Sequence, residues 1–136
     1  MRVVVHVDGG ARGNPGPAAV GAVVAAADGG GVLSERGEYI GKATNNVAEY
    51  RAVMLGLSLA RELGATEVEV VNDSELVARQ IGGQYRVKNP GLRPLYEETM
   101  AELRRFDRWA VRNVRREHNE RADELVNEAL DRALSG

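Results

Sequence analysis

The chain has 136 residues, of which 43% are hydrophobic and 28% charged, and its 18 lysines and arginines against 20 acids leave a formal net charge of −2. This length and composition suit a single globular domain over residues 1–136 and exclude an acidic disordered tail. The absence of cysteine excludes a disulfide framework, a zinc–cysteine site and a thiol nucleophile.

The sequence also lacks the patterns of membrane and secreted proteins. No apolar run approaches the roughly 18 residues needed to span a bilayer. Residues 1–10 hold too short an apolar segment for a signal peptide, and no small-residue cleavage site follows. We therefore expect a soluble, cytoplasmic protein with no membrane partner. Taken as a total, a net charge of −2 also argues against a nucleic-acid partner.

The first part of the chain predicts three strands. Valines fill most of residues 3–7, and such a nearly continuous apolar run is typical of a central strand that is covered on both faces. A glycine- and proline-rich turn is predicted over residues 9–16. Strand-like segments over 18–27 and 32–40 follow, joined by the hairpin signal DGGG at 28–31.

The rest of the chain predicts mainly helices. Apolar residues at helical spacing indicate a helix over 45–63, which Thr44 or Asn45 can cap and Gly64 ends. The later elements are a strand over 68–71, a short helix over 74–81, a helix from Pro94, a strand over 109–114 and a final helix from about Asn119. The order βββαβααβα predicts a mixed sheet with helices packed on its faces.

The charge is unevenly distributed along the chain. Residues 79–121 hold eleven lysines and arginines against six acids, a net +5, so the remainder carries −7. The asymmetry is compatible with a face that binds a polyanion, and equally with arginines that only solvate a helix. Charge by itself leaves both interpretations open.

Two aspartates end predicted strands. Asp8 follows the first apolar run, and Asp73 follows the strand over 68–71. Because ligands in open α/β sheets bind beyond the carboxyl ends of parallel strands, both side chains are expected to face one crevice. The alternatives are local, since aspartate before two glycines is an ordinary turn residue and Asp73 can cap the next helix.

Two further acids lie on predicted helices. Glu49 has mostly apolar neighbours, and glutamate is seldom buried unless it is paired or bound to a metal. The alternative for Glu49 is a solvated stripe shared with Asn45, Asn46 and Arg51. Asp123 falls in the first turn of the last helix, where the helix dipole favours a carboxylate and is a sufficient reason for it.

These four carboxylates would repel one another without cations if the fold clusters them. Hard oxygen ligands, no cysteine and no well-placed histidine pair favour Mg²⁺ or Mn²⁺ over zinc. Several carboxylates with open coordination positions suit a two-metal site for phosphoryl transfer. The segment over 9–16 matches neither the dinucleotide-binding nor the P-loop pattern, but its bare backbone can approach a sugar-phosphate chain closely.

Several short motifs follow one another along the chain: VDGG at 7–10 with GNPG at 13–16, TNNVAE at 44–49, NDS at 72–74 and NERADEL at 119–125. Their order and spacing resemble the type 1 ribonuclease H family over nearly the whole chain. The resemblance implies an α/β, ribonuclease H-like fold, with a five-stranded mixed sheet, an antiparallel second strand and helices on both faces. It also implies a metal-dependent endoribonuclease that hydrolyses the RNA strand of RNA–DNA hybrids by a two-metal-ion mechanism, leaving 5′-phosphate and 3′-hydroxyl ends.

The resemblance assigns roles to individual residues. The metal-binding catalytic acids, which would hold two Mg²⁺ ions or Mn²⁺, are Asp8, Glu49, Asp73 and Asp123, with Asp8 bridging both ions. The residues assigned to the hybrid are Gly9, Gly10, Arg12, Asn14, Thr44, Asn45, Asn46 and Ser74. Short amides suit this task because they can reach 2′-hydroxyls and base edges in a shallow minor groove.

The chain departs from the family pattern at three places. The segment before the last motif is too short for the histidine-bearing loop of many members, so Arg115, Arg116 and His118 are candidates for an auxiliary catalytic role. The basic loop over 82–93 is short, which predicts weaker and more salt-sensitive binding of the hybrid. Glu75 stands where a glutamine contact to RNA is common.

Two other functions compete with this interpretation. One is a nucleic-acid-binding module that kept the fold and lost turnover, although a binder gains nothing from four mutually repelling carboxylates. The other is a DNA nuclease or resolvase of related fold, which Asn14, Asn45 and Asn46 argue against. We expect an RNA–DNA hybrid as substrate, a monomer, and no protein partner.

Overall fold

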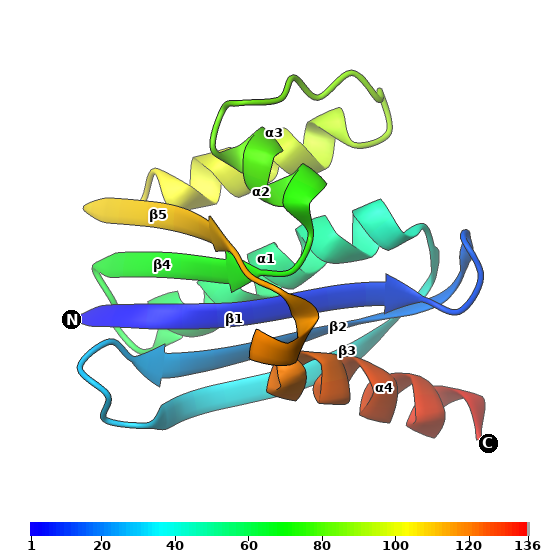
Figure 1. The fold of residues 1–136 in the computed structure, drawn as a ribbon, viewed down its shortest axis with the longest axis horizontal. Coiled ribbons are helices and arrows are strands. Elements are labelled where there is room, and N and C mark those ends of the chain that lie inside the picture. The colour runs from blue at the N-terminus through cyan, green and yellow to red at the C-terminus, as the bar shows by residue number, and fades with distance from the viewer. Residues whose placement is uncertain (136) are drawn as a thin grey trace.

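The computed structural model of the chain describes residues 1–135. Within them, one sheet of five strands runs in the order β3-β2-β1-β4-β5 and helices flank it (Figure 1). The strands are β1 (Arg2–Ala11), β2 (Gly16–Ala26), β3 (Val32–Ala43), β4 (Glu67–Asn72) and β5 (Arg108–Asn113). The helices are α1 (Asn45–Glu62), α2 (Glu75–Ile81), α3 (Arg93–Leu103), the 3₁₀ turn η1 (Arg116–His118) and α4 (Glu120–Leu134). The predicted order of strands and α-helices is confirmed.

The sheet is mixed, as predicted. β2 pairs antiparallel with both β1 and β3, whereas β4 lies parallel to β1 and β5 parallel to β4. β1 is therefore the central strand. Its face toward α1 is fully buried at Val3, Val5 and Val7, but Val4 and His6 on the other face are only half-buried, so the expected cover on both faces is incomplete.

The predicted turn over residues 9–16 is shorter than expected. Gly9, Gly10 and Ala11 continue β1 and pair with β2, which leaves only residues 12–15 between the two strands. The parallel pairing with β4 has already stopped at His6. β1 therefore passes beyond the end of β4, and the interpretation of its aspartate as a turn residue is wrong.

Helices pack on both faces of the sheet. On one face, α1 lies against β1 and β2, and a Cβ on Gly56 of α1 would meet the side chains of Val5 and Val7. On the other face, α4 crosses β2 and β3 and buries Val126, Ala129 and Leu130 in a small second core against β2. Figure 1 shows α1 and α4 on opposite sides of the strands. No described helix is both long and apolar enough to cross a membrane.

Two glycines of the sheet set how closely α4 approaches. A Cβ on Gly21 of β2 would lie 2.5 Å from the carbonyl oxygen of Ala122, and one on Gly37 of β3 would lie 2.7 Å from that of Leu125. Both distances are shorter than any real contact of a Cβ atom. The main chain of α4 therefore rests directly on the sheet, at a depth that larger residues would not allow.

Hydroxyl side chains cap the N-termini of two helices. Thr44 Oγ1 accepts a hydrogen bond from the Val47 N–H at 3.2 Å, and Ser74 Oγ accepts one from the Val77 N–H at 3.3 Å. The alternative interpretation of Asp73 as an N-cap is therefore wrong. Because the next residue caps α2, the Asp73 carboxylate is free for another use.

Candidate active site

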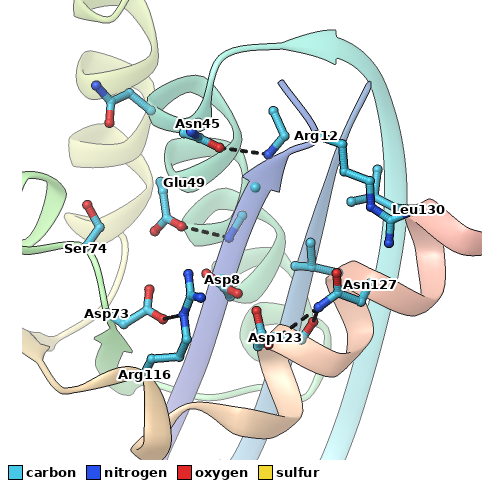
Figure 2. A pocket seen from close by; sticks show the side chains of 15 residues that line it. Asp8, Arg12, Asn45, Glu49, Asp73, Ser74, Arg116, Asp123, Asn127 and Leu130 are labelled. Carbon is cyan, nitrogen blue, oxygen red and sulfur yellow. Dashed lines mark hydrogen bonds and ion pairs between the residues drawn. The ribbon is translucent and has the colours of Figure 1, made fainter. Parts of the chain in front are cut away.

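A groove of about 420 Å³ opens where β1 passes the end of β4. Figure 2 shows its lining side chains, which come from β1, α1, the start of α2, η1 and α4. The lining consists of residues 8–12, Asn45, Asn46, Glu49, Asp73, Ser74, Arg116, Asp123, Val126, Asn127 and Leu130.

All four acids proposed from the sequence reach this groove. Asp8, Glu49 and Asp73 each offer a carboxylate oxygen, and these three atoms lie within 4.8 Å of one another. Asp123 lines the same groove from α4 but is outside this closest set. In Figure 2 the Asp8 side chain lies between those of Asp73 and Asp123. Residues more than a hundred positions apart in sequence thus form one acidic cluster.

Glu49 is held against β1 by a main-chain hydrogen bond. The Gly9 N–H donates to Glu49 Oε1 at 3.0 Å, and the glutamate is only 7% exposed. Glu49 therefore does not belong to a solvated stripe, which was the alternative. Burial raises its pKa to about 7, although the Gly9 N–H stabilises the charged form.

Asp8 and Asp73 are in similar surroundings. Burial, together with the charges of Glu49 and Asp73, raises the pKa of Asp8 to about 10. Burial also raises the pKa of Asp73, and the nearby Arg116 opposes this effect. These shifts mean that the ionised cluster is costly without a compensating positive charge.

The donor set fits a divalent cation. Glu49 Oε2 and Asp73 Oδ2 are buried and have no hydrogen-bond partner, an arrangement that costs free energy unless something else satisfies these oxygens. Carboxylate oxygens from β1, from α1 and from the link between β4 and α2 converge there, and hard oxygen donors are the ligands that Mg²⁺ and Mn²⁺ prefer. The residues present therefore suit the metals expected from the sequence.

The three auxiliary candidates lie in different places. Arg116 lines the groove, with its Nε 3.8 Å from Asp73 Oδ2. Arg115 lies 3.9 Å from the carboxylate of Glu117, and His118 lines a separate cavity of about 260 Å³ together with His6. Of the three, the structure therefore brings Arg116 to the acids.

The residues assigned to substrate binding divide into two groups. Six of the eight line the groove: Gly9, Gly10, Arg12, Asn45, Asn46 and Ser74. Asn14 is exposed and outside the lining; its Oδ1 accepts the Asn45 N–H at 3.0 Å, while Asn45 Oδ1 accepts the Ala11 N–H at 2.9 Å. Thr44 is occupied in capping α1. These bonds tie the end of β1 to the start of α1.

Four residues of the groove were missed by the sequence analysis: Ala11, Val126, Asn127 and Leu130. The last three stand three, four and seven positions after Asp123, so they share its face of α4. Helical spacing counted from Asp123 was the signal that could have found them. Ala11 had no such signal, because it fell inside the predicted turn.

Most of the cationic side chains in residues 79–121 form ion pairs with acids of the same protein. Seven of these eleven cations lie within 4.0 Å of a carboxylate, namely Arg79, Arg105, Arg108, Arg112, Arg115, Arg116 and Arg121. In the described part of the chain, those outside such pairs are Arg86, Lys88, Arg93 and Arg104. Three of these four belong to the basic loop over 82–93, which is left as the main candidate for contact with a polyanion.

Comparisons with known proteins agree with the motif resemblance. A family model described as "Reverse transcriptase-like" matches residues 6–129. The chain is 50% identical over 133 residues to the bifunctional protein Rv2228c of Mycobacterium tuberculosis, covering 98% of this chain but 36% of that protein. It is 46% identical over 132 residues to the ribonuclease HI of Halobacterium salinarum, covering 97% of this chain and 66% of that one.

Solved structures extend the same likeness to three dimensions. The crystal structure of LC11-RNase H1 in complex with an RNA/DNA hybrid matches with a TM-score of 0.92 and 44% identity, covering 97% of this chain and 99% of that one. The five-stranded mixed sheet, its antiparallel second strand and the helices on both faces are those expected from the resemblance. The chain belongs to the ribonuclease H family of enzymes.

Proposed function

We propose that the chain is a metal-dependent endoribonuclease that hydrolyses the RNA strand of RNA–DNA hybrids. The observation that carries this proposal is the acidic cluster, in which two buried carboxylate oxygens of Glu49 and Asp73 lack a hydrogen-bond partner. The hybrid bound to the similar LC11-RNase H1 supports the choice of substrate. The proposed products carry 5′-phosphate and 3′-hydroxyl ends.

The four acids Asp8, Glu49, Asp73 and Asp123 would hold two Mg²⁺ ions, with Mn²⁺ as a substitute. When bound, such a pair of ions activates the attacking water and stabilises the departing 3′ oxygen. Asp8 would hold the metal together with the other acids, because its carboxylate is flanked by those of all three. Burial of the cluster lowers the local dielectric and so strengthens its hold on a cation.

The groove next to the acids would hold the hybrid. The amides of Asn45 and Asn46 lie on its α1 side, and amides of this length suit 2′-hydroxyls and base edges. Gly9 and Gly10 line the groove with main chain, and at Gly10 no side chain keeps a sugar-phosphate backbone away. Asn14 would act through Asn45, which it holds in place.

The remaining parts of the proposal concern the whole protein. We propose that residues 1–136 act as one domain, which the single sheet built from both halves of the described chain supports. A monomeric state and a cytoplasmic location also belong to this proposal. Light scattering coupled to size-exclusion chromatography tests the first, and cell fractionation tests the second.

A substrate panel tests the proposed activity. We expect the protein with Mg²⁺ or Mn²⁺ to cut the RNA strand of a hybrid, and to do so far faster than it cuts double-stranded DNA. Chelation of the metal should stop the reaction, and the new 5′ ends should be sensitive to phosphatase. Hybrid binding without cleavage at any metal concentration would favour the binding module, while preferential cutting of DNA would favour a DNA nuclease.

Removal of the Arg116 side chain is expected to slow hybrid cleavage. In Arg116→Ala we expect about a 10-fold lower kcat, because the guanidinium beside Asp73 no longer offsets negative charge where the phosphate must enter. The effect stays moderate because the side chain is 79% exposed. His118→Ala is the matched variant and should cut at the wild-type rate. A larger loss of kcat in His118→Ala than in Arg116→Ala would give the auxiliary role to His118 instead of Arg116.

A further inference from the structure

Asp123 is placed differently from the other three acids. It lies in the first turn of α4, is only half-buried, and is outside the set of oxygens that approach within 4.8 Å. A carboxylate in such a position can rotate more freely than the buried Asp8 or Glu49. A contact that limits the rotation of the Asp123 carboxylate would help it to bind a metal together with Asp8 and Glu49.

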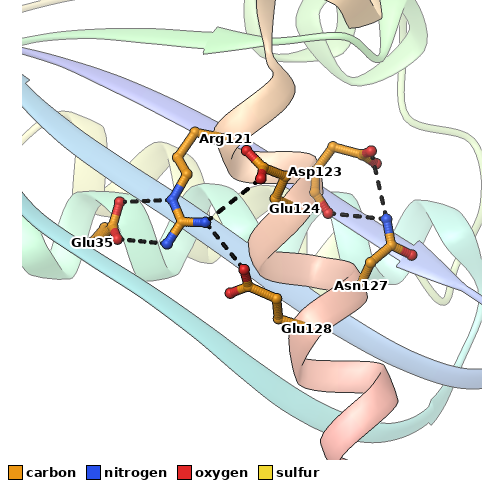
Figure 3. A network of polar contacts seen from close by, with 6 residues as sticks. All are labelled: Glu35, Arg121, Asp123, Glu124, Asn127 and Glu128. Atoms are coloured by element: carbon orange, nitrogen blue, oxygen red, sulfur yellow. Dashed lines mark hydrogen bonds and ion pairs between the residues drawn. The ribbon is translucent and has the colours of Figure 1, made fainter.

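Two features fix the helix that carries Asp123. The main chain of α4 rests on Gly21 and Gly37 of the sheet. Arg121 then joins the helix to β3, with its Nη2 2.7 Å and its Nε 3.1 Å from the two carboxylate oxygens of Glu35 (Figure 3). Its Nη1 also lies 3.2 Å from Glu128 Oε1. The position of the helix is thus set, and only the side-chain rotation of Asp123 is left.

Asn127 contacts Asp123 in a way that limits this rotation. Its Nδ2 donates to the main-chain oxygen of Asp123 at 3.1 Å and lies 3.5 Å from the carboxylate Oδ2 (Figure 3). The first bond anchors the amide on the helix itself. The second contact favours the rotation in which Oδ2 of the carboxylate faces the amide, so that Oδ1 is left to bind a cation.

We propose that Asn127 is a positioning residue that orients Asp123 for metal binding. This inference rests on the proposed function, since it assigns Asn127 a task at the same metal site. Partners that hydrogen-bond a ligating carboxylate commonly change metal affinity or activity by about 10- to 100-fold when they are removed. The alternative is direct contact with the hybrid, because Asn127 is exposed and lines the groove.

Metal titrations of Asn127→Ala separate these roles. We expect the Mg²⁺ concentration for half-maximal cleavage to rise about 10-fold or more, with less than a twofold change in KM for the hybrid. Calorimetry with Mn²⁺ alone, without substrate, should show weaker binding by a similar factor. Asn127→Gln keeps an amide on the same face and should recover part of the affinity.

Stability and a matched variant act as controls. Alanine favours helices more than asparagine does, so the Tm of Asn127→Ala should not fall, and weaker metal binding would not come from unfolding. Ser135→Ala also removes a side-chain donor to a main-chain carbonyl of α4, far from the acids, and should leave both titrations unchanged.

Two results would overturn the positioning role. One is an unchanged Mn²⁺ titration in Asn127→Ala. The other is a raised KM for the hybrid with unaltered metal binding, which would mean that Asn127 touches the substrate. Failure of the wild-type protein to cleave hybrids would count against the proposed function instead, and the Mn²⁺ titration would still decide the role of Asn127.

Discussion

Asp8→Asn is expected to abolish hybrid cleavage while leaving the fold intact. Asp8 is 5% exposed and lies against the other three acids, so an amide of the same shape fits there but cannot replace a charged ligand. We expect the rate to fall by about a thousand-fold or more. An undiminished rate would remove Asp8 from the metal site.

The same substitution should stabilise the protein in the absence of divalent ions. The pKa of Asp8 is raised from its ordinary value of 3.8 to about 10. The stability that the protonated side chain contributes is therefore fully present below about pH 4 and is lost as the pH rises from there to about 10. Asparagine does not titrate, so the variant should have a higher Tm than the wild type at neutral pH and a similar Tm below pH 4.

Thermal melts with and without Mg²⁺ measure how the ion changes the stability of the wild type and of Asp8→Asn. The ion should raise the Tm of the wild type and have much less effect on Asp8→Asn, because ligands stabilise the state that binds them. Asp28→Asn, in the exposed hairpin between β2 and β3, is the matched control and should behave as wild type in melts and cleavage. A wild-type Tm that does not respond to Mg²⁺ or Mn²⁺ would contradict the metal site.

Gly9→Ala is expected to damage both fold and activity. A Cβ on Gly9 would overlap the main-chain carbonyl group of Ala48 and lie 2.7 Å from the nitrogen of Glu49. Main chain stands on both sides of this contact, so only a shift of α1 away from β1 relieves it. Overpacking of this kind costs about 3 kcal/mol of unfolding free energy, and the shift would also separate Glu49 from Asp8.

Urea unfolding of Gly9→Ala and Gly10→Ala tests this contact. At the neighbouring Gly10, a Cβ would meet nothing closer than Val126 Cγ1 at 3.9 Å, which is an ordinary van der Waals distance. The two variants make the same chemical change in the same strand, yet only the first should lower the midpoint strongly. Equal midpoints would mean that α1 does not rest on Gly9.

Sequence patterns predicted the elements well where side-chain periodicity decides them. The run over residues 3–7 and the helical spacing after Asn45 led to β1 and α1. The pattern failed at Gly9 and Gly10, which have the local signature of a turn but extend β1 because β2 supplies hydrogen-bond partners. Pairing with β2, in which Gly9 faces Val20 and Gly10 faces Ala19, decided the conformation there.

The candidate site was predictable in its residue types but not in its geometry. Motif resemblance pointed to Asp8 and Asp123, yet only the structure shows that Asp123 is outside the closest set of oxygens. The net +5 of residues 79–121 likewise left open whether the segment forms a face that binds a polyanion. Four of its arginines pair with acids from distant segments, such as Arg121 with Glu35, and no linear count of charge reveals such pairs.

The core beneath α4 is small, so this helix is expected to be held less strongly than the elements around the main core. Ala19, Val126, Ala129 and Leu130 form that core, while the larger core on the α1 side holds twenty buried residues. The amides of α4 should therefore exchange with solvent by local opening before those of β1 do. Each such opening would carry Asp123 away while Asp8 and Glu49 stay together, so a cation bound by all three would slow the opening. Metal binding at the acids and the closed position of α4 would thus be thermodynamically linked, each favouring the other.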